Sequence, residues 1–162
     1  MAYSTVPKST DYFNTKLYTG TGSSNAQTGV GFQPDFTWLK GRSNAPDHFL
    51  FDAIRGATNS IRSNVNSATY TNAQLLTAFG TDGFTVGTDG NVNTNGQTFA
   101  SWNWKANGSG SANSDGSISS TVSVNTTSGF SIVTYTGNAT SGATIGHGLG
   151  VAPAVVLVKR LN

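Results

Sequence analysis

The stretch YTGTGSSNAQTGVGFQ (residues 18–33) returns later in the chain as YTGNATSGATIGHGLG (residues 135–150). Both copies begin Tyr-Thr-Gly, and both place eight residues between that triplet and a Gly-x-Gly. The register extends beyond these residues, with a two-residue insertion before the proline of the second copy. The matched pairs are Phe13 and Phe130, Tyr18 and Tyr135, Gly20 and Gly137, Gly29 and Gly146, Gly31 and Gly148, Pro34 and Pro153, and Lys40 and Lys159. Such a repeat indicates that the chain begins the same structural unit twice.

The repeated unit has the pattern of two strands joined by a loop. FNTKLYTG (13–20) alternates between two faces, which predicts a strand with one face buried. A loop rich in Gly, Ser and Asn follows, and PDFTWLKGR (34–42) predicts the second strand. In the second copy, PAVVLVKR (153–160) is apolar on both faces, as expected of a strand that is covered on both sides.

More strands are predicted between the two copies. HFLFDAI (48–54) has the pattern of one strand, and QTFASWNWKA (97–106) has that of another. NAQLLTAFG (72–80) predicts a short helix or turn that begins at an asparagine cap and stops at a glycine. The side chains expected in the core are Phe36, Phe51, Trp102 and Trp104.

The sequence therefore predicts an all-β fold, an antiparallel β-sandwich of jelly-roll type over residues 1–106. Residues 107–117 lack large apolar side chains and predict a linker. Residues 118–162 look like the opening strands of a second, incomplete unit, because they hold too few strands for a sandwich of their own.

The composition excludes several classes of protein. Charged residues make up 10% of the chain, the net charge is +2, and the basic residues are scattered, so no nucleic-acid surface is predicted. Cysteine is absent, which excludes disulfides and thiolate metal sites. The N-terminus lacks the apolar stretch of a secretory signal, and no apolar run is long enough to span a membrane.

Nothing in the sequence indicates catalysis, and we expect no enzyme and no cofactor. Glutamate is absent, a Gly-x-Ser-x-Gly nucleophile motif is absent, and most of the aspartates fall in predicted turns or at strand ends. The chain has two histidines, and His147 occupies the position that Val30 holds in the first copy. A functional histidine is not expected to be replaced by valine in the other copy of the same repeat. His147 is therefore interpreted as a turn residue.

Four residues are candidates for a ligand site: Trp38, Asp47, His48 and Arg55. The alternative for Arg55 is a local ion pair with Asp52 that closes a turn, and this interpretation is favoured. The three tryptophans could stack on sugar rings or fill the sandwich core, and the core is favoured for at least two of them.

One loop could hold a hard cation. In DGNVNTNG (89–96), Asp89, Asn91 and Asn93 present alternating oxygen ligands. The spacing departs from the EF-hand pattern, because Thr94 stands at the glycine position and Ala100 at the position of the bidentate acid. A solvent-exposed loop without an ion is the favoured interpretation.

Several segments together resemble a domain found in virion structural proteins of marine tailed phages, especially those of cyanobacteria. They are FNTKLYTGTGS (13–23), TGVGFQPDFTWLKGRS (28–43), HFLFDAIRG (48–56) and FGTDGFTVGTDGNVNTNGQTFASWNWKANG (79–108). The junction beyond them, including GHGLGVAP (146–153), resembles the same family. The resemblance implies a jelly roll similar to concanavalin-like lectins, on the surface of a phage particle. It brings no catalytic residues with it.

Two functions follow as expectations. The first is a non-enzymatic virion component, a tail fibre or capsid decoration protein with a role in host adhesion. The alternative is a lectin-like module that binds host surface glycans. Members of the resembled family run on to complete a second domain, so the chain is expected to be a fragment or a shortened relative. The apolar stretch at 155–158 needs partner strands, which would come from the first domain, from a neighbouring subunit or from chain outside this sequence. We expect contacts with other virion proteins and with other copies, giving a homo-oligomer, a trimer by analogy with fibres.

Overall fold

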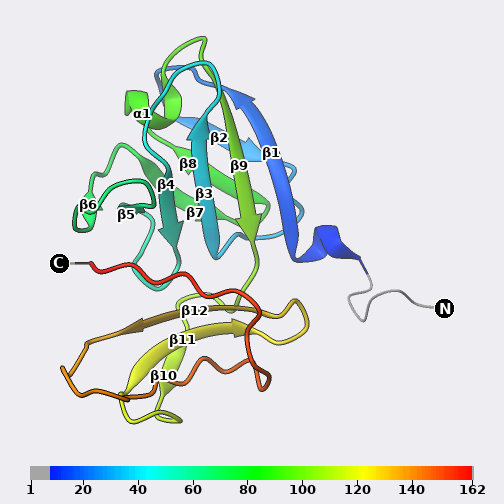
Figure 1. Cartoon of the computed structure of the whole chain (residues 1–162). Coiled ribbons are helices and arrows are strands. Elements are labelled where there is room, and N and C mark those ends of the chain that lie inside the picture. Colours follow the sequence, from blue (N-terminus) through cyan, green and yellow to red (C-terminus); the bar gives the residue numbers. More distant parts are fainter. Residues whose placement is uncertain (1–7, 162) are drawn as a thin grey trace.

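The computed structural model describes residues 8–161, and its regular secondary structure consists almost entirely of antiparallel strands (Figure 1). The predicted all-β antiparallel fold is confirmed. The strands are β1 (Phe13–Thr19), β2 (Asn25–Thr28), β3 (Phe36–Gly41), β4 (Phe49–Asp52), β5 (Asn59–Arg62), β6 (Tyr70–Thr71), β7 (Leu76–Gly80), β8 (Gly83–Val86), β9 (Thr98–Trp104), β10 (Ser111–Asn113), β11 (Ser120–Asn125) and β12 (Phe130–Tyr135). The helices are the 3-10 turn η1 (Ser9–Asp11) and α1 (Gly90–Asn93). Within residues 8–161, no helix is long and apolar enough to cross a membrane.

Two sheets make up the first unit, which we define as residues 8–106. The front sheet has the order β1-β9-β3-β4-β5-β6, and the back sheet, β2-β8-β7, lies behind it (Figure 1). Their facing side chains form a buried core that includes Leu39, Phe51 and Phe99 from the front and Phe84 and Val86 from the back. Burying this much apolar surface is the main favourable term in folding the sandwich.

The core face of β9 is the opposite of the one expected from the sequence. The prediction that Trp102 and Trp104 fill the core was wrong, because Phe99, Ser101 and Asn103 are the fully buried residues of this strand. The two indoles are half-buried on the outer face, and so is Phe36 on β3. The polar inner residues are tolerated because they hydrogen-bond one another: the Asn103 amide donates to Ser101 Oγ at 2.9 Å.

The segment at 72–80 also differs from its prediction. Of the expected short helix or turn, only a turn is present at the start of the segment, where Asn72 accepts a hydrogen bond from the Gln74 N–H, and Leu76–Gly80 forms the strand β7. Leu75 and Leu76 are completely buried in the core. The burial of these two leucines and the pairing of β7 with β8 outweigh the helix propensity of the segment, so it forms a strand.

The second unit, residues 107–161, contains a separate three-stranded sheet of order β10-β11-β12, which we call the lower sheet. The segment expected to be a linker, 107–117, contains β10, which pairs with β11. Gly110 makes this possible, because its φ is +75° and a Cβ there would collide with the Val122 carbonyl. The connection is therefore part of a folded unit.

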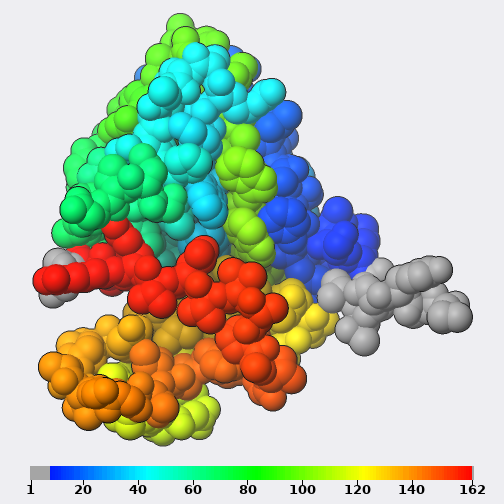
Figure 2. All heavy atoms as spheres, viewed as in Figure 1, coloured from blue at the N-terminus to red at the C-terminus, as the bar shows by residue number. Residues whose placement is uncertain are grey.

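Residues 151–161 run back across the molecule without forming a strand (Figure 2). The predicted strand at 153–160 is therefore absent from this chain in isolation. Four successive residues, Val155 to Val158, are each at least 67% exposed.

Candidate functional site

The outer face of the front sheet carries all three tryptophans of the chain. In the register of β3 with β9, Trp38 lies opposite Trp102, and Phe36 lies opposite Trp104. The rings of Trp38 and Trp102 have centroids 6.2 Å apart and an interplanar angle of 69°. Because side chains alternate along a strand, this pairing places the indoles on the side that the back sheet does not cover.

His48 lies beside Trp38, immediately before β4. The indole Nε1 of Trp38 donates a hydrogen bond of 2.9 Å to Nδ1 of His48. An accepting Nδ1 carries no proton, so the neutral imidazole must carry its proton on Nε2. Among the described residues, Nε2 has no hydrogen-bond partner in the structure. The site therefore offers the Nε2–H of His48 as a hydrogen-bond donor next to the aromatic rings.

A shallow cavity of about 260 Å³ is lined by Trp38, His48, Trp102 and Trp104. Three of its four lining side chains are indoles, and the fourth is the imidazole that accepts from one of them. Binding sites for small molecules are typically apolar hollows with a few placed polar groups. This cavity has that character, although it opens on a sheet face and not in a deep cleft.

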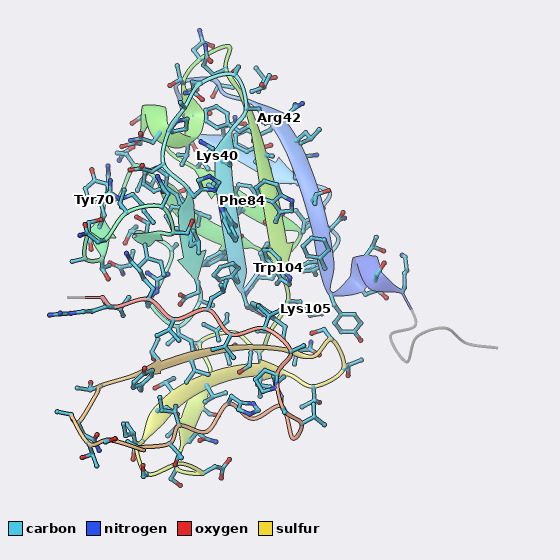
Figure 3. The ribbon with its side chains drawn as sticks, in the orientation of Figure 1. Lys40, Arg42, Tyr70, Phe84, Trp104 and Lys105 are labelled. Atoms are coloured by element: carbon cyan, nitrogen blue, oxygen red, sulfur yellow. The ribbon has the colours of Figure 1, made fainter. Side chains whose placement is uncertain are left out.

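Trp104 belongs both to the cavity and to the joint between the two units. Its ring stacks on Phe130 of β12 with centroids 5.9 Å apart and an angle of 19°. Phe13 and Phe36 also pack on Trp104, with centroid distances of 4.8 and 5.4 Å. Figure 3 places Trp104 and Lys105 at the end of the front sheet that faces the second unit. Trp104 is thus held by its neighbours, whereas Trp38 and Trp102 present freer faces.

Buried hydrogen bonds fix the same joint. The Asp35 carboxylate, 4% exposed, accepts from the Ala106 N–H at 2.7 Å, just where the chain leaves β9. The Asp35 N–H donates to the Trp104 carbonyl at 2.9 Å, and the Asn107 N–H donates to Ser123 Oγ at 2.8 Å. These bonds hold Trp104 in place relative to the lower sheet.

Burial and the nearby Lys40 charge favour the neutral form of His48. Burial lowers the pKa of His48 below its ordinary 6.5, the nearby Lys40 ammonium lowers it further, and Asp47 opposes the shift. Asp47 is engaged elsewhere: it accepts from Asn64 Nδ2 and from Arg62 Nη1, each at 2.7 Å. These hydrogen bonds, with Asn64 first, hold the pKa of the Asp47 carboxyl below its usual value.

The four ligand candidates from the sequence are only partly brought together. Trp38 and His48 line the cavity, and Asp47 lies next in sequence with its carboxylate committed to Arg62 and Asn64. Arg55 is not among the lining residues.

The ion pair expected between Asp52 and Arg55 is present, with 2.6 Å between Oδ2 and Nε. The Arg55 guanidinium also donates to the backbone carbonyls of Leu50 and Asn59. Its role is to close the turn between β4 and β5.

Two of the three residues considered for a metal, Asp89 and Asn93, accept hydrogen bonds from donors of the protein. Asp89 caps α1, accepting from the Asn91 N–H at 2.8 Å. Asn93 is completely buried: its Oδ1 accepts from the Thr21 N–H and from Asn25, and its amide donates to two backbone carbonyls. Within residues 8–161, no group of three or more acidic or histidine side chains could hold a metal ion. The loop is held by hydrogen bonds within itself and to residues 21–25.

Two features of the site were missed at the sequence level. Lys40 lies two residues after Trp38 on β3, so the two side chains share a face of the sheet. The two-residue period of the strand pattern was enough to predict this. The stacking of Phe130 on Trp104 joins residues of different units, and no local pattern in the sequence indicates it.

Comparison with known proteins gives one match. A family model described as "Domain of unknown function (DUF7483)" matches residues 8–162. No curated protein and no solved structure matches the chain.

Proposed function

We propose that this chain, which belongs to the DUF7483 family, is a non-enzymatic module that binds carbohydrate on the outer face of its front sheet. The observation that carries the proposal is the cavity of about 260 Å³ lined by Trp38, His48, Trp102 and Trp104. An aromatic hollow of this size on an open sheet face suits one sugar ring of a longer glycan.

The chemistry of the lining supports a sugar as the ligand. A pyranose ring has an apolar face of C–H groups, and an indole offers a large, rigid apolar surface with a negative π face. Trp38 and Trp102 supply such surfaces from neighbouring strands. The Nε2–H of His48 can donate to a ring hydroxyl, since Nδ1 already accepts from Trp38. Stacking supplies affinity, and the N–H donor of His48 supplies orientation.

The setting that we propose is the surface of a phage particle, as part of a tail fibre or a capsid decoration protein. This part rests on the resemblance of segments such as TGVGFQPDFTWLKGRS (28–43) to virion proteins of marine tailed phages. A surface protein that binds glycans would serve host attachment, so the virion role and the lectin role are compatible.

A second candidate function is a purely structural one, in assembly of the particle. The exposed apolar stretch Val155 to Val158 favours it, because contiguous exposed apolar residues mark interaction sites. In that case the aromatic face would serve protein contacts and would bind no sugar.

A glycan array followed by titration separates the two functions. The full chain is screened against neutral and acidic glycans, and the best is titrated by calorimetry. We expect Trp102→Ala to weaken binding at least about tenfold, the factor equivalent to 1.4 kcal/mol. The matched control is Tyr135→Ala, which removes an aromatic ring that is 44% exposed on the second unit and should leave affinity unchanged. No binding to any glycan at millimolar concentration, or equal loss in both variants, would refute the carbohydrate site.

A further inference from the structure

The sequence contains two Asn-Gly pairs, Asn95-Gly96 and Asn107-Gly108, and both asparagines are exposed. An asparagine loses its side-chain amide most readily before a glycine, because glycine places no side chain in the way of ring closure. The nucleophile in this reaction is the backbone nitrogen of the glycine. The pair whose glycine nitrogen is free of hydrogen bonds should therefore react first.

The fold protects the nitrogen of Gly96. Its N–H donates to the Gly20 carbonyl at 3.0 Å, just beyond the end of β1. The Gly20 N–H donates in return to the Gln97 carbonyl at 2.8 Å, and the Gln97 N–H donates to the Thr94 carbonyl at 3.1 Å. Attack by Gly96 on the side chain of Asn95 would first have to break the bond to Gly20.

Gly108 is in the opposite situation, on the connection that runs from β9 to the lower sheet (Figure 1). Within residues 8–161, nothing accepts a hydrogen bond from its N–H, and the side-chain amide of Asn107 has no hydrogen-bond partner there either. The φ of Gly108 is +60°, and no atom beyond its chain neighbours lies within 4 Å of the place that a Cβ would take. The nitrogen is free, and the exposed side chain of Asn107 can rotate towards it.

We propose that Asn107 is a site of spontaneous covalent modification. The nitrogen of Gly108 bonds to Cγ of Asn107, the Cγ–Nδ2 bond breaks, and ammonia leaves with the proton of the attacking amide. Water then opens the resulting succinimide ring. Opening at Cγ gives aspartate, whereas opening at the main-chain carbonyl carbon gives isoaspartate, in which the main chain runs through Cβ and Cγ. In sum, one amide and one water give one carboxyl group and one ammonia.

The position of Asn107 gives the modification a structural effect, because this residue anchors the second unit. Its own N–H donates to Ser123 Oγ at 2.8 Å. The preceding N–H, that of Ala106, donates to the buried carboxylate of Asp35 at 2.7 Å. A new carboxylate one residue beyond that N–H adds a second negative charge near Asp35, and like charges repel.

Isoaspartate adds a further disturbance, since it inserts the Cβ methylene into the main chain. The Asn107 carbonyl accepts from the Gly110 N–H at 3.3 Å and so closes the turn that leads into β10. Gly110 packs so closely on the Val122 carbonyl of β11 that a Cβ would collide with it. A longer main chain between these two fixed points must shift the turn or β10. The modified chain should therefore hold the lower sheet less firmly.

The first test compares the two asparagines in the same molecule. The full chain is kept at mildly alkaline pH, which favours deprotonation of the attacking nitrogen, and samples are analysed over time by mass spectrometry. Trypsin cleaves after Lys105 and so separates Asn95 from Asn107, and fragmentation of each peptide locates the modified residue. We expect deamidation at Asn107 to be at least about fivefold faster than at Asn95, the factor that one net hydrogen bond is worth.

Urea supplies the control for the effect of the fold. In the unfolded chain both glycine nitrogens are free, so the two rates should become similar. Equal rates in the folded chain, a faster reaction at Asn95, or no reaction at Asn107 would overturn the proposal.

A second test measures the effect on the lower sheet by hydrogen exchange. Exchange at β10 and β11 should become faster as the parent ages, while exchange at β7 and β8 stays constant. Asn107→Gln is the matched variant, because glutamine would have to close a larger, slower ring and the exposed Asn107 side chain makes no hydrogen bond that the change would remove. Asn95→Gln should age like the parent.

The outcome of the second test is clear in both directions. Ageing that accelerates exchange in the parent but not in Asn107→Gln supports the modification as the cause. An unchanged lower sheet in fully converted parent, or equal acceleration in Asn107→Gln, would contradict it. Neither test depends on sugar binding, so this inference can fail while the proposed function stands.

Discussion

The indole nitrogen of Trp38 donates to Nδ1 of His48 across 2.9 Å, and this contact determines which imidazole nitrogen keeps its proton. If His48 becomes charged, Nδ1 gains a hydrogen and two donors face each other. The aromatic cavity therefore contains a titratable group whose neutral form it prefers.

Stability should fall as the solution is acidified through the titration of His48. Its pKa in the folded state lies below the ordinary 6.5, so the unfolded chain takes up the proton first. The stabilisation is fully present above pH 6.5 and is lost as the pH falls through the lower, folded-state pKa. His48→Asn keeps an acceptor that does not titrate, and thermal melts of this variant should lose that part of the pH dependence.

The tautomer of His48 can be checked directly. Long-range proton–nitrogen NMR spectra at neutral pH should show the Nε2–H tautomer for His48. An Nδ1–H tautomer would contradict the hydrogen bond.

Removing Trp104 should destabilise the protein more than removing Trp102. Trp104 packs on Phe13, Phe36 and Phe130, so Trp104→Ala opens a hole at the joint of the two units. We expect a loss of about 2–4 kcal/mol for Trp104→Ala, near the range for buried aromatic truncations, and about 1 kcal/mol for Trp102→Ala. Denaturant unfolding monitored by circular dichroism measures both, and equal losses would show that Trp102 is as tightly packed as Trp104.

Asn93→Ala should be strongly destabilising. Its buried side chain satisfies the Thr21 N–H and the backbone carbonyls of Ser23 and Gly87. Unpaired buried polar groups cost about 1–3 kcal/mol each, so we expect a total loss of at least about 3 kcal/mol. Asn91→Ala is the neighbouring control: Asn91 is exposed and its side chain bonds only to Asp89, so unfolding should change by about 0.5 kcal/mol or less.

Metal removal should leave the melting temperature unchanged. The oxygens of Asp89 and Asn93 already accept hydrogen bonds from N–H groups of the protein, which fill the positions that a cation would need. The measurement is a thermal melt with and without EDTA. A clear decrease in the presence of the chelator would mean that this loop binds an ion after all.

Asp82→Asn should destabilise the protein at neutral pH and have no effect in strong acid. The carboxylate accepts from the N–H groups of Gly29 and Gly31, at 2.9 and 2.6 Å, and these bonds hold its pKa below the ordinary 3.8. The stabilisation is therefore present above pH 3.8 and disappears as the pH falls through the lower folded-state pKa.

The experiment compares the melting temperatures of Asp82→Asn and parent at neutral pH and in strong acid. Asp115→Asn is a control, since Asp115 is an exposed aspartate that accepts from Asn113 in a turn of its own unit. A difference between parent and Asp82→Asn that persists unchanged in acid would contradict the role of the charged carboxylate.

The positions of the strands were largely predictable from the sequence, but which face of a strand points into the core was not. Alternation correctly placed a strand at β9, but both of its faces carry aromatic rings, Phe99 on one and Trp102 with Trp104 on the other. The choice depends on Ser101 and Asn103 finding hydrogen-bond partners inside the sandwich, which a local pattern cannot reveal.

The candidate site, too, was only partly predictable from the sequence. Trp38 and His48 were both ligand candidates from the sequence, His48 as part of a polar cluster around the strand at 48–54 and Trp38 as an indole that could stack on a sugar ring. Their contact depends on the pairing of β3 with β4, and the contribution of Trp102 depends on the pairing of β3 with β9. Arg55 was also a candidate, but its partner Asp52 lies only three residues away, and this local ion pair uses its guanidinium.

The stacking of Phe130 on Trp104 has a mechanical consequence. Trp104 touches the cavity with one part of its ring system and the second unit with another. A ligand that holds this indole in its stacked position must, by thermodynamic reciprocity, also oppose the rotation of the two units away from each other. Occupancy of the cavity would then increase the force needed to peel the lower sheet from the first unit, which single-molecule pulling with and without ligand would measure.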